Sequence, residues 1–69
     1  MEIRDRLAHL VPHWIEHNDA HAQQFAEWTE RAREAGLDHA ADELQAAESA
    51  LQQANKALKR ARAALQEGR

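Results

Sequence analysis

Residues 33–44 read REAGLDHAADEL, and this stretch divides a chain that is otherwise rich in helix-forming residues. Gly36 is suited to close one helix, because glycine readily adopts the left-handed conformation found at helix ends. Asp38 is suited to cap the start of the next helix. Because the connection over 36–38 is so short, we expect two antiparallel helices that form a helical hairpin.

The segment over 39–67 has the strongest periodicity in the chain. Leucines and alanines each recur every seven residues, as Leu37, Leu44, Leu51, Leu58 and Leu65 with Ala40, Ala47, Ala54 and Ala61 between them. This pattern predicts a long helix with a seam of alternating large and small side chains that packs closely against a neighbour. Further alanines widen the apolar stripe to roughly 160°, whereas one contact needs about 100°. A stripe this broad predicts two neighbours, the first helix and a second chain.

Pro12 complicates the first half of the chain, since proline suits the first turn of a helix and disrupts a helix interior. We expect a main helix over 12–35, preceded by a short helical segment over 3–10. A single kinked helix is the alternative.

The three aromatic residues Trp14, Phe25 and Trp28 recur at helical spacing. They are predicted to form the core, packed against the alanines of the second helix. The chain, 1–69, is then one all-α domain. Because a domain this small buries little surface alone, we expect homo-oligomerisation, with a dimeric four-helix bundle as the favoured form.

Histidines are concentrated in one run, HLVPHWIEHNDAH, where they stand four residues apart at His9, His13, His17 and His21. This spacing aligns side chains along a helix face, and a pair of histidines at i and i+4 can bind one divalent ion. We therefore take His13, His17 and His21 as candidate metal ligands, with His21 near the centre of the apolar stripe. Glu16 and Asp19 point away from the stripe, so they are better candidates for groups around the site than for inner ligands, and Glu16 is the better of the two because it flanks His13.

The ligand types limit the choice of metal. The chain has no cysteine, and imidazole with carboxylate favours Ni(II), Co(II), Zn(II) or Cu(II) over calcium and magnesium. One straight helix cannot easily aim three residues at one ion, so further ligands are expected from a second chain or from water. His9 precedes Pro12, so its inclusion in the site depends on how the chain bends there.

Composition excludes several other classes of protein. The net charge of −3 argues against nucleic-acid binding, which normally needs a basic surface. The apolar runs are too short to span a membrane, and no signal peptide is evident, so a cytoplasmic protein is expected. The sequence lacks a Ser/His/Asp order and a glycine-rich loop, and we do not expect an enzyme.

The run PHWIEHN over 12–18, followed by His21, resembles a small histidine-rich helical domain associated with nickel and cobalt handling in microbes. The likeness extends from about residue 10, through the aromatic stretch and the glycine turn, to the C-terminus. It implies that His13, His17 and His21 are metal ligands, with Glu16 as a possible fourth, and it adds weight to metal binding more than to the choice of metal. Ni(II) or Co(II) is the favoured ion, with Zn(II) or Cu(II) as alternatives.

The sequence therefore predicts a small metal chaperone, store or buffer that binds a transition metal, with a metal-recipient protein as a possible partner. A structural or protein-interaction bundle without metal is the main alternative. In a third interpretation, the bundle is pH-sensitive, because protonation of His17 and His21 in the seam would loosen it.

Overall fold

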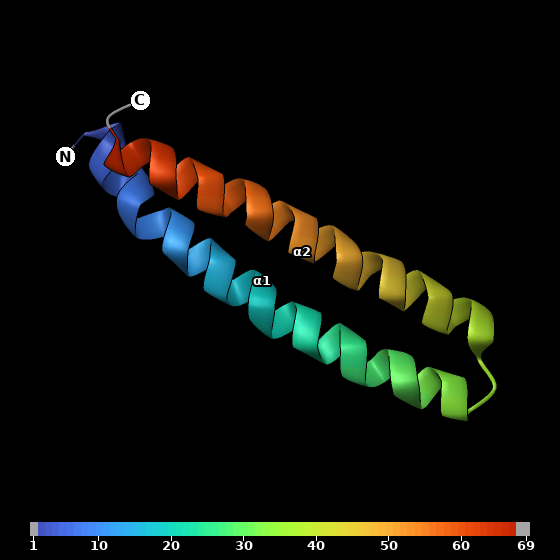
Figure 1. Cartoon of the computed structure of the whole chain (residues 1–69). Helices are drawn as coiled ribbons and strands as arrows, with labels where there is room; N and C mark the ends of the chain where they lie inside the picture. The colour runs from blue at the N-terminus through green and yellow to red at the C-terminus, as the bar shows by residue number, and fades with distance from the viewer. Residues whose placement is uncertain (1, 68–69) are drawn as a thin grey trace.

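The structure is a computed structural model that describes residues 2–67. Helix α1 spans Ile3–Glu34 and helix α2 spans Asp38–Gln66. The helices pack side by side in opposite directions, so the start of α1 and the end of α2 lie at one end of the hairpin and the turn at the other (Figure 1). The described residues form these two helices and no strand, which confirms the all-α hairpin. Within the described range, neither helix is long and apolar enough to cross a membrane.

The turn follows the prediction at Gly36, which adopts a φ of 77°. The N–H of Leu37 donates to the carbonyl of Ala32 at 2.8 Å, and the N–H of Gly36 donates to the carbonyl of Arg33 at 3.0 Å. This pair of hydrogen bonds is the Schellman arrangement that closes helix ends. The prediction for Asp38 is wrong by one residue, because Leu37 holds the cap position without a side-chain hydrogen bond and Asp38 is the first helical residue. The carboxylate of Asp38 still interacts favourably with the positive end of the helix dipole.

Helix α1 passes through Pro12 without a break, so the expected separate segment before the proline and the helix start at the proline are both wrong. Tertiary contacts explain the continuity. Val11 and Ile15, on either side of the proline, are 3% and 7% exposed against α2. The guanidinium of Arg4 donates to the carbonyl of Leu65 at 2.7 Å and joins the first turn of α1 to the end of α2. These contacts offset the hydrogen bond that proline removes from a helix interior.

The core within one chain is small and lies on a different side of α1 than expected. Its buried residues are Val11, Ile15, Ala22 and Ala41, with the polar Thr29 and Asn55. Trp14 and Trp28 are 40% and 54% exposed, so the prediction that they form the core is wrong for the single chain, and Phe25 is only half-buried. At 100° per residue the two tryptophans lie roughly 70–110° from the centre of the buried face. Smaller side chains occupy that centre and let the helices approach closely.

The leucine and alanine rows of α2 are only partly used inside the hairpin. Ala41 is fully buried against α1, whereas the leucines at 44, 51, 58 and 65 are half-buried. In the alanine row, Ala40, Ala54 and Ala61 are exposed. The broad apolar stripe of α2 therefore contacts α1 along one edge and leaves its other edge open.

Asn55 forms a buried hydrogen-bond network that the sequence analysis did not anticipate. Its side-chain N–H groups donate to the carbonyl of Ile15 at 3.1 Å and to a carboxylate oxygen of Asp19 at 2.8 Å. Its side-chain carbonyl accepts a hydrogen bond from Asn18 at 3.0 Å. Among the described residues no buried side-chain polar atom lacks a partner. A single asparagine in an apolar seam fixes the register of two helices, because any shift leaves its amide unpaired.

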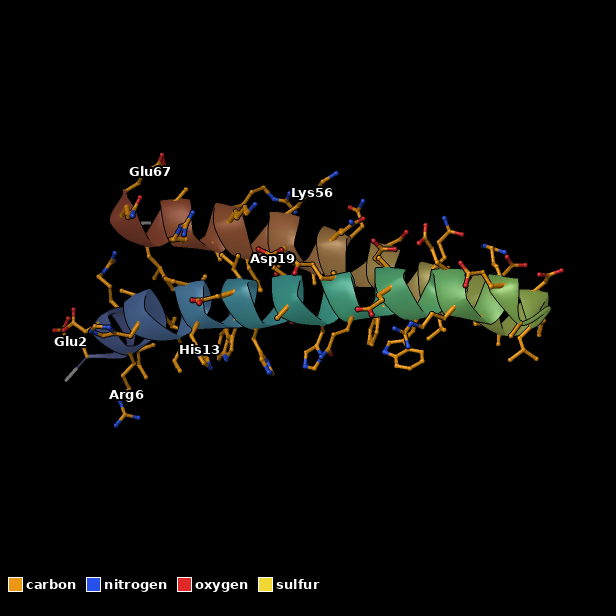
Figure 2. The ribbon with its side chains drawn as sticks, turned by 90° about the horizontal axis from the view of Figure 1, so that it is seen from below. Glu2, Arg6, His13, Asp19, Lys56 and Glu67 are labelled. Atoms are coloured by element: carbon orange, nitrogen blue, oxygen red, sulfur yellow. The ribbon has the colours of Figure 1, made fainter. Side chains whose placement is uncertain are left out.

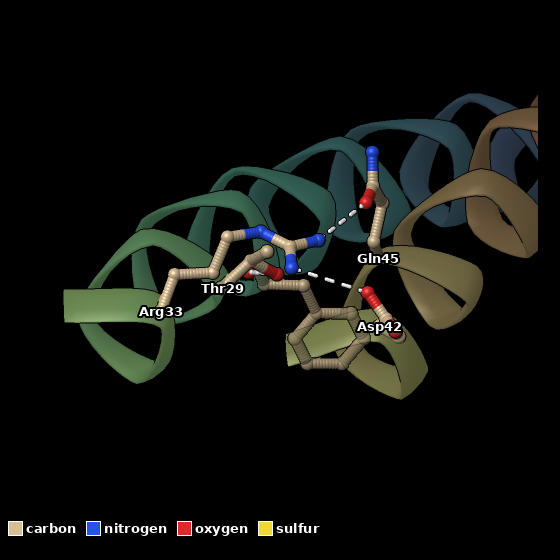
Figure 3. A network of polar contacts seen from close by, with 5 residues as sticks. Thr29, Arg33, Asp42 and Gln45 are labelled. Carbon is tan, nitrogen blue, oxygen red and sulfur yellow. Dashed lines mark hydrogen bonds and ion pairs between the residues drawn. The ribbon is translucent and has the colours of Figure 1, made fainter. Parts of the chain in front are cut away.

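A second polar contact joins the helices nearer the turn. The guanidinium of Arg33 on α1 donates to Asp42 at 3.1 Å and to the side-chain carbonyl of Gln45 at 2.9 Å, both on α2 (Figure 3). This contact is exposed and contributes little stability. It marks the polar face of the hairpin, on the same side as Asp19.

Candidate metal site

The histidine row forms a chain of ring contacts along α1. The rings of His13 and His17 are nearly parallel, with centroids 6.0 Å apart. The rings of His17 and His21 meet edge to face at 4.6 Å, and the ring of His21 lies 6.1 Å from that of Phe25. The spacing of four residues thus places consecutive imidazoles within reach of one another, as the sequence predicts.

The row crosses α1 obliquely from solvent toward α2. His13 and His17 are exposed and His21 is half-buried, because each step of four residues turns the side chain by about 40°. His13 lies on the edge of α1 that points away from α2, whereas Asp19 lies on the side toward α2 (Figure 2). His21 therefore lies at the boundary of the intrachain contact and outside its centre.

The other predicted ligands border the outer end of the row. An open hollow of about 240 Å³ is lined by His13, Glu16, His17 and Ala20. Glu16 is exposed beside the two imidazoles, where its carboxylate can approach a cation bound by either ring. His9 is also exposed, one turn before His13 and outside this hollow.

The structure brings these residues together as neighbours and does not converge them on one point. Within residues 2–67 of one chain, no three His, Cys, Asp or Glu side chains are placed to hold a single ion. The cause is the drift of the row, because the rings of His13 and His21 point about 80° apart around the helix. One chain therefore offers ligand pairs, at His13/His17 and at His17/His21.

An apolar surface adjoins the inner end of the row. On α1 it includes Leu10, Trp14 and Trp28, which are 41%, 40% and 54% exposed, and on α2 it continues over the leucine and alanine rows. Near the turn, Trp28, Leu37 and Leu44 line a mostly apolar hollow, together with Arg31, whose guanidinium lies 4.8 Å from the centre of the Trp28 ring. We call this surface, from Leu10 to the turn on α1 and from Leu37 to Leu65 on α2, the open face. It lies opposite the polar face. His17 and His21, at the edge of the open face, each stand two residues from Asp19 on the polar face, and residues two apart on a helix point about 200° apart.

Fold and site together define a class of protein, a small helical hairpin with a row of histidines along one edge of an apolar face. The chain belongs to the family described as a domain of unknown function (DUF8180), whose family model matches residues 7–65. That range contains the histidines at 9–21, the turn, and nearly all of both helices. Comparison with curated proteins and with solved structures gave no match.

Proposed function

We propose that this protein binds a divalent transition metal through its histidine row and serves as a small metal chaperone, store or buffer. The observation that carries the proposal is the separation of the His17 and His21 rings. Metal–nitrogen bonds of about 2.0–2.1 Å place an imidazole centroid about 3.2 Å from the ion, so two rings at 90–110° lie roughly 4.5–5.2 Å apart. The observed 4.6 Å falls within this range.

The second pair supports the same chemistry at the outer end of the row. The His13 and His17 centroids are 6.0 Å apart and the rings are nearly parallel, so each centroid must move by less than about 1 Å, and the rings must turn toward one point, to share an ion. Both histidines are exposed, and such rotations are fast in exposed side chains. His17 belongs to both pairs, which would let an ion pass from the outer pair to the inner one.

The ligand set suits borderline metals. Imidazole nitrogens bind Ni(II), Co(II), Zn(II) and Cu(II), and a site with two nitrogens from one chain retains open positions for water or for a ligand from another protein. Open positions favour exchange of the ion, as transfer to a metal-recipient protein requires. We favour Ni(II) or Co(II), with Zn(II) or Cu(II) as alternatives.

Calorimetric titration of chelator-stripped protein with each of the four metals tests the proposal. We expect submicromolar binding that His17→Ala weakens strongly, because that substitution removes both pairs. His39→Ala is the matched control, since His39 is exposed at the start of α2 and stands apart from the row. Binding no tighter than the millimolar range, or equal binding by His17→Ala, would refute the metal function.

A protein-interaction module without metal is the second candidate, and the open face favours it. Exposed tryptophans beside rows of leucine and alanine form a contiguous apolar surface of the kind that marks contact sites. The melting temperature separates the two functions. A metal-binding module gains thermal stability from added metal and loses that gain in His17→Ala, whereas an interaction module is indifferent to both.

A further inference from the structure

The open face gives this hairpin an apolar surface along nearly its whole length. In α2 the two rows that reach it consist only of leucine and alanine, from Leu37 to Leu65. In α1 the same face carries Leu10, Trp14 and Trp28, and the histidine pair His17/His21 lies midway between the ends of that helix. The two imidazoles are the polar groups at the centre of this face.

We propose that a second copy of this chain covers the open face in an antiparallel dimer. In that dimer His17 and His21 of both copies meet at the two-fold axis and bind one transition-metal ion. The metal part of this inference rests on the function proposed above. The dimer part rests on the open face alone.

The size of the face fits a second copy. The Cα atoms of the hairpin extend over 50 × 17 × 12 Å. The broad side of that outline gives a footprint on the order of 850 Å² per protomer, close to the roughly 800 Å² per partner that standard stable interfaces bury. A two-fold dimer is self-complementary, so one apolar face is sufficient for both partners.

Sequence spacing sets the register of the two α1 helices. Two sets of α1 residues, each at seven-residue intervals, run along the open face. One contains Trp14, His21 and Trp28. The other contains Leu10 and His17 and continues toward the turn as the polar Gln24 and Arg31, with the guanidinium of Arg31 4.8 Å from the centre of the Trp28 ring. In an antiparallel pair, each set of one helix interleaves with the other set of its partner. The register with the fullest overlap of α1 then places Leu10 opposite Trp28 of the second copy and His17 opposite His21 of the second copy.

Helix α2 is compatible with the same axis. The hydrogen bond between Asn18 and Asn55 shows that these two residues lie at one level of the hairpin. Ala54, the neighbour of Asn55, is exposed and belongs to the alanine row, so it lies near the level of the histidine pair. A small residue at this level lets the two α2 helices approach closely, since interaxial distance depends on the side chains at the contact.

This arrangement completes a ligand set that one chain lacks. Within the described part of a single chain, only pairs of ligands are brought together. Two copies of the His17/His21 pair supply four imidazole nitrogens around one point, a ligand set suited to a borderline transition metal. The dimer thereby fills positions that one chain leaves open, which favours storage of the ion over its transfer. His13 lies one turn further out in each copy, beside the bound ion and outside its inner ligands.

Sedimentation equilibrium and Ni(II) titration of the same samples test the inference. We expect the metal-free chain, of 7.8 kDa, to be a dimer at tens of micromolar and to bind half an ion per chain. Ala54→Arg places two cations near the axis and adds no metal ligand, so it should give a folded monomer, with unchanged circular dichroism, that loses the tight binding phase. Ala46→Arg, at an exposed α2 position that points about 100° away from the alanine row, should behave as the wild type.

The other outcomes would overturn the dimer, the shared site or the metal function, as follows. A wild-type chain that stays monomeric at about 100 µM, with and without Ni(II), would overturn the dimer. A dimer that binds one ion per chain, or tight binding retained by monomeric Ala54→Arg, would overturn the shared site and leave the metal function standing. A dimer that binds no Ni(II), Co(II), Zn(II) or Cu(II) would refute the metal function and the shared site together, while supporting the open face as an interface.

Discussion

Asn55→Ala is the substitution that probes the hairpin most directly. Asn55 is 5% exposed in the middle of α2 and makes three hydrogen bonds to α1. The alanine side chain fits the seam but forms none of these bonds. We expect the helices to stay helical and the packed hairpin to lose stability.

The magnitude follows from the three partners of Asn55. The carbonyl of Ile15 retains its own helical hydrogen bond, so that loss costs little. The bond to Asp19 has a charged acceptor, a type that contributes roughly 1.5–3 kcal/mol, and the bond from Asn18 is neutral and contributes roughly 0.5–1.5 kcal/mol. Asp19 is exposed and Asn18 is half-buried, so water partly replaces both bonds. The expected loss is therefore about 2 kcal/mol, or roughly 8–16 °C in melting temperature for a domain of this size.

Thermal and urea denaturation followed by circular dichroism at a fixed chain concentration measure this loss. Gln53→Ala is the matched control, because Gln53 is exposed on α2 two residues away, and it should change stability by less than about 0.5 kcal/mol. A double-mutant cycle with Asp19→Ala should give a coupling free energy of about 1 kcal/mol. A loss below about 0.5 kcal/mol in Asn55→Ala, or no coupling to Asp19, would show that the network does not stabilise the hairpin.

Four further outcomes follow from the geometry. Gly36→Ala should lower the free energy of unfolding, measured by urea denaturation, by about 1–2 kcal/mol, because a φ of 77° is strained for any residue with a Cβ. The loss should not be larger, because the new Cβ meets no neighbouring atom. Pro12→Ala should raise the melting temperature, with a gain of up to about 3 kcal/mol, because it restores an N–H donor inside α1. Arg33→Ala should cost less than about 1 kcal/mol, and that cost should shrink in 1 M salt, because its ion pair with Asp42 is exposed. Metal affinity should fall as the solution is made more acidic, since protons compete with the metal for imidazole nitrogens, and an affinity independent of pH would exclude histidine ligands.

Much of the fold could be predicted from local chemistry. A glycine at the turn readily adopts the left-handed conformation that closes a helix. Leucines that recur every seven residues are aligned on one side only by an α-helix. The continuity of α1 could not be predicted in the same way, because it depends on how well Val11 and Ile15 pack against α2 around Pro12. Local preference and tertiary contact opposed each other at that residue, and the contact prevailed.

The positions of the tryptophans expose a limit of periodicity. Trp14 and Trp28 dominate the apolar stripe of α1 by size, so the sequence places the centre of burial on them. The two-helix contact instead selects the side chains that allow close approach, and Ala22 and Ala41 are 8% and 0% exposed. The proposed dimer would account for the difference, because a stripe that faces two neighbours has its centre between their contacts.

The candidate site divides along similar lines. The spacing of the histidines predicts which rings are neighbours, because helix geometry alone fixes that relation, and the contacts between His13, His17 and His21 follow it. The role of Asp19 could not be predicted, because its partner Asn55 lies on the other helix. The sequence around a helical asparagine does not show whether its side chain is buried against another helix or exposed to solvent.

The asparagine network and the histidine row are related through the turn of α1 that carries both. Asn18 and Asp19, which bond to Asn55, lie in sequence between His17 and His21. These hydrogen bonds therefore hold one turn of α1 against α2. The other side of that turn carries the pair of imidazoles. A shift of α2 along α1 by one turn, about 5.4 Å, would move Ala54 away from the level of the histidines. Because that shift also leaves the Asn55 amide unpaired, the network fixes the level at which the open face carries its imidazoles.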